Sequence, residues 1–239
     1  LTVDNTAQLI ANGNTVKNGT NLFTAANGSF TMNGAFTNTA GNLVSNSAAV
    51  IALNGETRWD VGTLILAAAG GLTVGAGGSF TLLGGSVQLS NTGVFTCNGA
   101  FANPSGNIAV GSSSFILNGN ATFGGGGFNS AANAGAIRIL GAGTLAGTFN
   151  NVSPGYGTFE LNRAGQTLLL AAGNLITNNL QLTNGIIQTA GGANYVSVLN
   201  TLTAMGGLGT YIDGKLRWRL GAGAITPPNT FLFPVGKSG

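Results

Sequence analysis

An internal repeat limits the folds that are open to this chain. The stretch FTMNGAFTNTAGN at 30–42 aligns with FTCNGAFANPSGN at 95–107 at an offset of 65, which matches Phe30 to Phe95 and Asn33 to Asn98. The Asn-Gly pairs that close the two blocks, at 54–55 and 118–119, align at an offset of 64, so one residue is gained or lost between them. Three coils of about 21–22 residues span that offset, and periods of roughly 20–50 residues are typical of solenoids and stacked arrays.

The residues within the repeats indicate short β-strands. Short runs rich in Val, Ile, Leu, Phe and Thr end in Gly, Asn or Ser, as in GSFTMNG at 28–34, AVIALNG at 49–55 and GVFTCNG at 93–99. Alternating apolar and Thr or Ser positions suit strands with one buried face. Asn-Gly occurs eight times. Both residues tolerate positive φ, so each pair fits either a hairpin turn or a solenoid corner.

We therefore predict an all-β fold, a right-handed parallel β-solenoid (β-helix) of about ten coils of roughly 20–22 residues. The alternative is an antiparallel β-sandwich with hairpins at the Asn-Gly pairs. Residues 1–200 are assigned to solenoid repeats, and 201–239 to a C-terminal β module that continues or caps the solenoid and is truncated at its end. The less regular segment 124–160 is expected to be a wider coil or an outward loop.

The same pattern predicts the core. In a solenoid, Val, Ile, Leu and Phe stack inward in columns, whereas Asn side chains at the corners form hydrogen-bonded ladders. Six phenylalanines beside Thr, Ser and Gly are expected in such columns: Phe30, Phe36, Phe80, Phe95, Phe101 and Phe115. The single cysteine, Cys97, lies in one of the strand patterns and is expected to act as a small buried hydrophobe.

Charge is scarce, and this limits the chemistry of the chain. It has no His, eight Lys and Arg and five Asp and Glu, so charged residues are 5% of the chain, against roughly 25% in ordinary domains. A hydrophobic content of 44% excludes disorder. Glycosidases need a paired acid and base, but only Glu56 and Asp60 are close in sequence. We expect no enzyme, catalytic residue, cofactor or metal, no nucleic-acid partner and no transmembrane helix.

Two stretches gather charge. In a strand, KLRWRL at 215–220 places Lys215, Arg217 and Arg219 on one face and Trp218 on the other. The basic face is either a stripe for anionic glycans, lipopolysaccharide or a neighbouring subunit, or a solvated cover over a buried face. In GETRWDVG at 55–62, the side chains of Glu56, Arg58 and Asp60 are expected to form surface ion pairs opposite Trp59.

The last third of the chain carries a resemblance. LLLAAGNLITNNLQLTNGIIQT at 168–189, GTYIDGKLRWRL at 209–220 and FLFPVGKSG at 231–239 resemble segments of large secreted β-helical adhesin-like surface proteins of Bacteroidota, many of them type IX secretion substrates. The resemblance covers 166–239. It implies an extracellular or cell-surface location and a structural or adhesive role, and it transfers no catalytic residue.

These observations predict a structural and adhesive segment of a cell-surface or filament protein, acting as a stiff spacer or fibre subunit. The alternative is a carbohydrate-binding or polysaccharide-processing β-helix. Expected partners are copies of the chain itself or adjoining domains of a longer chain, and surface glycans. Apolar ends that break off in mid-pattern favour assembly end to end or side by side, with 215–220 as the candidate junction.

Overall fold

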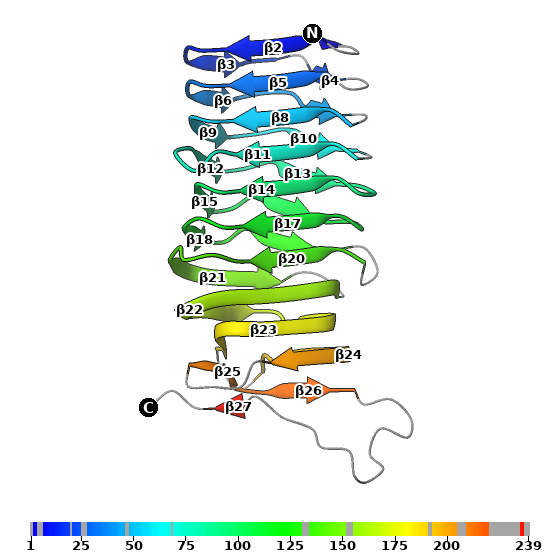
Figure 1. Ribbon diagram of the computed structural model, residues 1–239, viewed down its shortest axis with the longest axis vertical. Helices are drawn as coiled ribbons and strands as arrows, with labels where there is room; N and C mark the ends of the chain where they lie inside the picture. Colours follow the sequence, from blue (N-terminus) through cyan, green and yellow to red (C-terminus); the bar gives the residue numbers. More distant parts are fainter. Residues whose placement is uncertain are drawn as a thin grey trace.

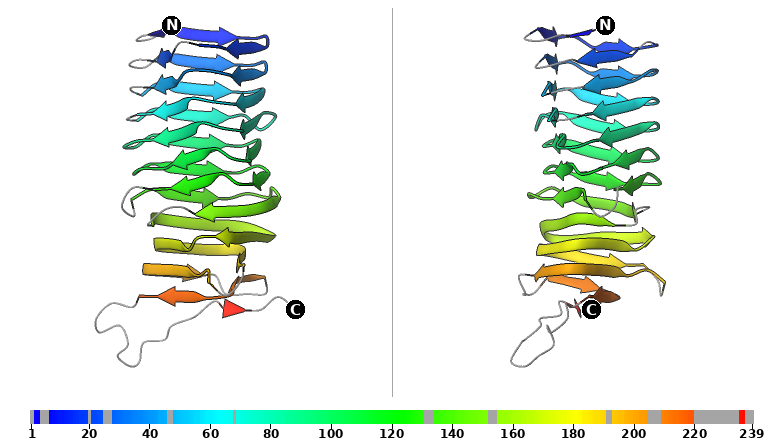
Figure 2. Two further views of the ribbon diagram at one scale, coloured as in Figure 1. Left: turned by 180° about the vertical axis from the view of Figure 1, so that it is seen from behind. Right: turned by 90° about the vertical axis from the view of Figure 1, so that its right-hand side faces the viewer.

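A computed structural model describes most of the chain, namely residues 2–3, 7–19, 21–24, 28–45, 48–67, 69–130, 134–151, 155–190, 193–204, 209–219 and 235–236. This part contains 27 strands and no helix. The strands stack in about nine turns along the long axis (Figures 1 and 2). All strand pairings are parallel, as for β5 with β8 and β9 with β12. The parallel β-solenoid is confirmed and the antiparallel sandwich is excluded. The right-handed coil stays a prediction from strand twist.

Each upper coil contributes three strands, one to each of three faces. Face 1 contains β2 (Gln8–Ala11), β5 (Ser29–Met32), β8 (Val50–Leu53), β11 (Gly71–Val74), β14 (Val94–Cys97), β17 (Ser114–Leu117) and β20 (Ala136–Ile139). Face 2 contains β3 (Thr15–Lys17), β6 (Phe36–Asn38), β9 (Glu56–Trp59), β12 (Ser79–Leu82), β15 (Ala100–Asn103) and β18 (Ala121–Phe123). Face 3 contains β1 (Thr2–Val3), β4 (Leu22–Thr24), β7 (Leu43–Ser45), β10 (Thr63–Leu66), β13 (Ser86–Leu89), β16 (Asn107–Ala109) and β19 (Gly127–Asn129).

The lower coils contain longer strands. They are β21 (Leu145–Asn151), β22 (Tyr156–Ala172), β23 (Leu175–Thr189) and β24 (Val196–Ala204), followed by β25 (Thr210–Asp213), β26 (Leu216–Trp218) and β27 (Val235–Gly236). β24 crosses the position 200 at which the sequence was divided, and β25 and β26 pair in parallel with β23 and β24. Between 124 and 160 the coil is wider, because Ala121 pairs with Leu145. Residues 131–133 and 152–154 lie outside the described part.

The strand register explains the sequence repeat. Phe30 pairs with Ile51, Ile51 with Leu72, and Leu72 with Phe95, so the two FT-x-NG blocks lie in one column three coils apart. Phe95 then pairs with Phe115, a step of only 20 residues. The first two steps are 21 residues and the third is 23, so the step of 20 that begins at β14 replaces one of 21 and changes the offset over three coils from 65 to 64.

The interior is a single hydrophobic core, and aromatic rings form its upper part. All six phenylalanines predicted to be buried are at most 2% exposed. Ring contacts run without a break from Phe30 to Phe159, and the two closest, Phe95 with Phe115 and Phe128 with Phe149, are stacked pairs with centroids 4.6 Å apart. Below Phe159 the core is aliphatic, with Leu180 and Leu182 fully buried.

Most of the described Asn-Gly pairs are solenoid corners that follow face 1, whereas Asn184-Gly185 lies within β23. The amide of Asn33 donates to Asn12 at 2.8 Å, and Asn54 donates to Asn33 at 2.8 Å. Matching bonds join Asn118 to Asn98 and Asn184 to Asn162. The expected Asn ladders are therefore present.

The reason for glycine at these corners differs from the prediction. Among the Asn-Gly pairs that the structure describes in full, which leaves out the pair at 27–28, only Gly19 and Gly185 have positive φ. At the other described corners, successive glycine backbones lie almost on top of each other. A Cβ on Gly99 would approach the Gly78 carbonyl oxygen to 2.0 Å, and one on Gly119 would approach that of Gly99 to 1.9 Å. Close packing between coils, rather than unusual φ, is what requires glycine there.

Candidate functional site

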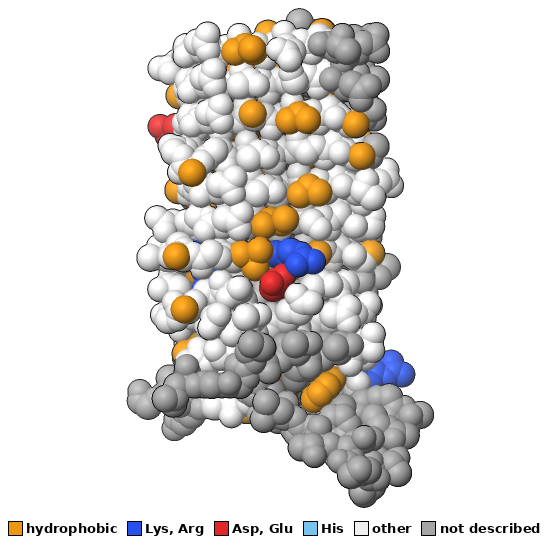
Figure 3. Space-filling model, in the orientation of Figure 1, with side chains coloured by type: hydrophobic (Ala, Val, Ile, Leu, Met, Phe, Trp, Pro, Cys, Tyr) orange, Lys and Arg blue, Asp and Glu red, His pale blue; other side chains and the backbone are white. Residues whose placement is uncertain are grey.

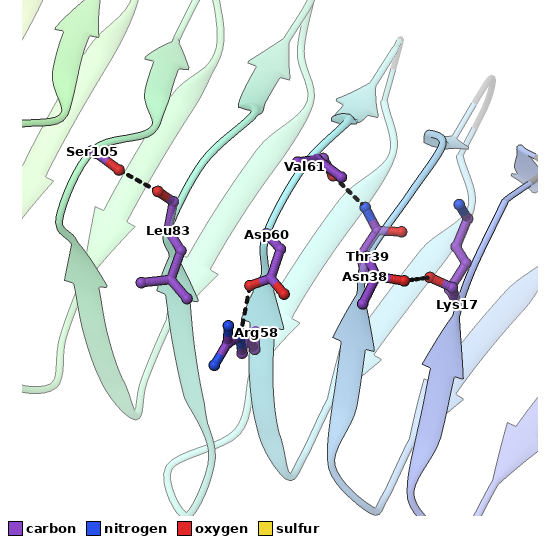
Figure 4. Close-up of polar contacts among 8 residues, drawn as sticks. All are labelled: Lys17, Asn38, Thr39, Arg58, Asp60, Val61, Leu83 and Ser105. Atoms are coloured by element: carbon purple, nitrogen blue, oxygen red, sulfur yellow. Dashed lines mark hydrogen bonds and ion pairs between the residues drawn. The ribbon is translucent and has the colours of Figure 1, made fainter.

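The described surface carries little charge, and four of its charged side chains form two ion pairs. Arg58 on β9 contacts Asp60 with Nε and Oδ1 2.6 Å apart (Figure 4), as the sequence predicted, while Trp59 points inward and is fully buried. The hydrogen bond to Asp60 raises the pKa of Arg58. Arg138 and Glu160 form a second pair between adjacent coils of face 1, at 2.5 Å. Each pair contains a single carboxylate, and that carboxylate is bound to an arginine.

The corner after face 2 is closed by polar groups that point inward. The Asn38 amide donates to the carbonyls of Gly41 and Val61, the latter shown in Figure 4. One coil below, the Trp59 indole donates to Gly62. Asn and Trp thus occupy the same column position and bond the carbonyl three residues ahead. These groups stabilise the turn and face no solvent.

The basic strand, residues 215–219, is the candidate interaction site. Lys215, Arg217 and Arg219 are exposed, whereas Leu216 and Trp218 are half-buried and pack against the core. The predicted alternation is confirmed, and Leu220 lies outside the described residues. β26 pairs with β24, and Val196 donates a backbone hydrogen bond to the Lys215 carbonyl. Basic side chains are visible at the lower right edge of Figure 3.

The neighbouring coil adds an aromatic ring that the sequence pattern did not reveal. Tyr195 precedes β24, and the Arg217 guanidinium carbon lies 3.7 Å from the centroid of its ring. The Asn174 side chain accepts a hydrogen bond from the Tyr195 backbone. On the other side, the Trp218 indole donates to the Asn200 carbonyl. Stacking on Tyr195 orients the planar guanidinium and leaves its N–H edge available to an anionic group.

A stripe of this kind suits repeated anions. Alternate residues of a strand are roughly 6.5–7 Å apart, so the three cations form a row with that spacing. Carboxylates or sulfates on a flexible polymer can bind such a row one after another. Asp213 is the nearest acidic residue in sequence, and it accepts a hydrogen bond from Gln188. Three cations against this one carboxylate leave the row with a net positive charge.

A buried arginine is the one charged residue inside the described solenoid, and it was not predicted. Arg163 is 0% exposed, and its Nη2 donates to the carbonyls of Leu117 and Gly119 at 3.1 and 2.6 Å. Its Nε and Nη1 have no partner. Burial lowers the pKa of this group. The strand alternation Phe159, Leu161, Arg163 would have placed it inward.

Other chemistry is sparse in the described part of the chain. Cys97 is buried, as predicted, and burial raises the pKa of its thiol to about 12. Among these residues no three His, Cys, Asp or Glu side chains lie together in a way that could hold a metal ion. No described helix is long and apolar enough to cross a membrane.

Comparison of the chain with known protein families, with curated proteins and with solved structures finds no match.

Proposed function

We propose that this chain is a structural and adhesive segment of an extracellular or cell-surface protein, in which a stiff β-solenoid spacer carries a basic strand that contacts anionic glycans. We also propose that the chain is related to the secreted β-helical adhesin-like proteins of Bacteroidota, which residues 166–239 resemble. The observation that carries it is the continuous stack of parallel strands over one hydrophobic core, which contains the rings from Phe30 to Phe159.

Such a stack supports a mechanical role. Each coil contacts only its neighbours, so the stability of the rod is shared among many similar interfaces. Backbone hydrogen bonds between coils lie along the long axis. A pulling force along that axis therefore acts on several of these bonds in each coil at once.

The arrangement of acidic groups favours binding over polysaccharide processing. Asp60 is paired with Arg58, Glu160 with Arg138, and Asp213 is bonded by Gln188. Glycosidic hydrolysis needs two carboxyl groups roughly 5–10 Å apart across one bond. Glu56 and Glu160 belong to different faces of distant coils. We propose that the chain is not an enzyme.

Single-molecule stretching between the chain ends tests the spacer role. We expect distinct rupture events with lengthening of roughly 70 Å per coil of 21 residues, the contour of an extended chain. Smooth extension without rupture events would contradict a stiff spacer. Protease shaving or antibody labelling of intact source cells tests the location, and a protein accessible only after lysis would contradict it.

Retention on immobilised heparin and polygalacturonate tests the adhesive role. The triple variant Lys215→Ala, Arg217→Ala, Arg219→Ala should elute at lower salt than the natural chain. The charge-matched control Lys17→Ala, Arg58→Ala, Arg138→Ala removes three other surface cations and should elute later than the first variant. Equal elution of the two variants would mean that net charge alone, and not the basic strand, determines binding.

A further inference from the structure

A recess lies on face 3, at the corner that follows it. It has a volume of about 410 Å³ and is lined by Gln88, Leu89, Ser90, Ala109, Gly111, Asn129 and Ser130. That volume lies within the roughly 300–1,000 Å³ of small-molecule sites. The recess is far along the chain from the basic strand, and no Lys, Arg, Asp or Glu lines it.

The recess is found where the repeat loses a residue. Face 3 of successive coils is aligned by Ser86 with Asn107 and Asn107 with Gly127, while the next face begins at Val94, Ser114 and Ala136. The corner of the middle coil is therefore shorter than the corners above and below it. The recess lies beside this shortened corner, and Ala109 and Gly111 of the middle coil line it.

Two side-chain amides flank this gap without partners. Gln88, Ala109 and Asn129 are successive members of one outward column. In the part of the chain that the structure describes, neither the Gln88 amide nor the Asn129 amide makes a hydrogen bond. At the face 1 corner, in contrast, Asn side chains on adjacent coils bond at 2.8 Å. The same ladder cannot form here, because Ala109 on the strand between them has no amide and the two amide-bearing residues are two strand spacings, roughly 10 Å, apart.

We propose that this recess binds one unit of an uncharged saccharide, with the ring over Ala109 and its hydroxyl groups bonded by the Gln88 and Asn129 amides. This deepens the adhesive function proposed above and rests on it. An amide offers a donor and an acceptor side by side, which suits the hydroxyl groups of a sugar. The apolar floor suits the C–H face of the ring, and the absence of charge favours a neutral ligand over an anionic one.

Ser130 supports the wall of the recess. Its hydroxyl donates to the Gly111 carbonyl at 3.1 Å and accepts a hydrogen bond from the Gly135 backbone at 3.0 Å. It is 5% exposed, so it fixes the corner and contributes little to a ligand. Ser90 is exposed at the opposite rim and can bond a further hydroxyl group.

Titration of the full chain, labelled with ¹⁵N, tests the proposal. Glucose, galactose and N-acetylglucosamine are added separately, and the side-chain amide signals of Gln88 and Asn129 are followed. At least one sugar should shift both signals in a saturable way. Ala109→Gln should fill the recess and weaken that binding at least tenfold. Ala102→Gln, an outward position on face 2 of the same coil, should leave it unchanged.

Three results would overturn the site: no sugar shifts either amide, the two glutamine variants behave alike, or the double variant Gln88→Ala, Asn129→Ala binds normally. The double variant serves as the test if Ala109→Gln does not fold. Heparin retention of the same samples separates this site from the proposed function. Heparin retention that depends on the basic strand, without any sugar response, would remove only the recess. A sugar response together with heparin retention that is unchanged in the basic-strand variant would remove only the anionic-glycan site.

Discussion

In the coils formed by β2 to β20, each corner interrupts the strands, whereas β22 and β23 continue through a corner as strands of 17 and 15 residues. The upper corners stack glycine on glycine and join Asn side chains into ladders. The lower strands shift register instead, between Leu161 and Thr167, and Gly165 there has positive φ with open space around it. The same parallel stack is thus reached by close backbone packing in one region and by β-bulges in the other.

The two cores differ as well. Above Phe159 the rings contact each other from coil to coil, and below it the buried residues are mainly Leu, Ile and Val. Arg163 lies at the change between the regions, where its side chain donates to the carbonyls of Leu117 and Gly119 in the upper region. Parallel pairing between successive coils continues through both regions although their corners differ. The solenoid therefore depends on the register between coils more than on any one type of corner.

The largest expected effect comes from the aromatic core. Phe115 stacks on Phe95 at 4.6 Å and contacts Phe101 edge-on. Phe115→Ala should lower the free energy of unfolding by roughly 3–5 kcal/mol, because it removes buried area and leaves a cavity. Chemical denaturation measures this. Val16→Ala, at a site that is 67% exposed, should change stability by less than about 0.5 kcal/mol. Similar effects at both sites would refute the stacked core.

Arg163 tests the junction between the regions. Arg163→Ala should cost roughly 2–4 kcal/mol, because it leaves the Gly119 carbonyl without this donor and opens a void. Arg163→Met fills the same space without a buried charge and should stay within about 1.5 kcal/mol of the natural chain. Denaturant midpoints of the two variants measure the difference. If Arg163→Met lowers stability as much as Arg163→Ala does, the guanidinium group itself, and not the filled volume, stabilises the junction.

The stacked glycines give the next effect. A Cβ on Gly99 would meet the Gly78 carbonyl, whereas Gly13, in the same column, has nothing within 4 Å. Gly99→Ala should therefore destabilise the fold by roughly 1–3 kcal/mol through overpacking. Gly13→Ala should be close to neutral in thermal melts. A neutral Gly99→Ala would show that the coils can separate at this corner.

Much of the fold could be predicted from the sequence, because the repeat reports the register directly. The pairing of Phe30 with Ile51 and onward to Phe95 follows from that offset. The long lower strands could not be predicted, since Asn184-Gly185 reads as a corner but lies within β23. Periodicity alone does not distinguish a corner from a bulge.

The candidate site was predicted only in part. The alternation of Lys215, Arg217 and Trp218 fixes which side chains are exposed. The Tyr195 ring beneath Arg217 could not be found, because it depends on the pairing of Val196 with Leu216 between coils. The recess beside Ala109 had a visible signal, the single residue lost from the repeat, but its position required the structure.

The smallest expected effects concern the Asn ladders, and they compare the strength of the ladder bonds in the upper and lower regions. Asn33 bonds both Asn12 and Asn54, whereas Asn54 bonds only Asn33. These bonds are exposed, so Asn33→Ala should cost about 1 kcal/mol and Asn54→Ala about half of that.

Asn184 makes one ladder bond, to Asn162, in a half-buried setting. Asn184→Ala should therefore cost more than Asn54→Ala although each loses one bond, since less water reaches the group that is left unpaired. Denaturant midpoints measured at one pH and salt concentration check the order. Equal costs for Asn54→Ala and Asn184→Ala would mean that the bent lower strands protect their ladder no better than the open upper corners do.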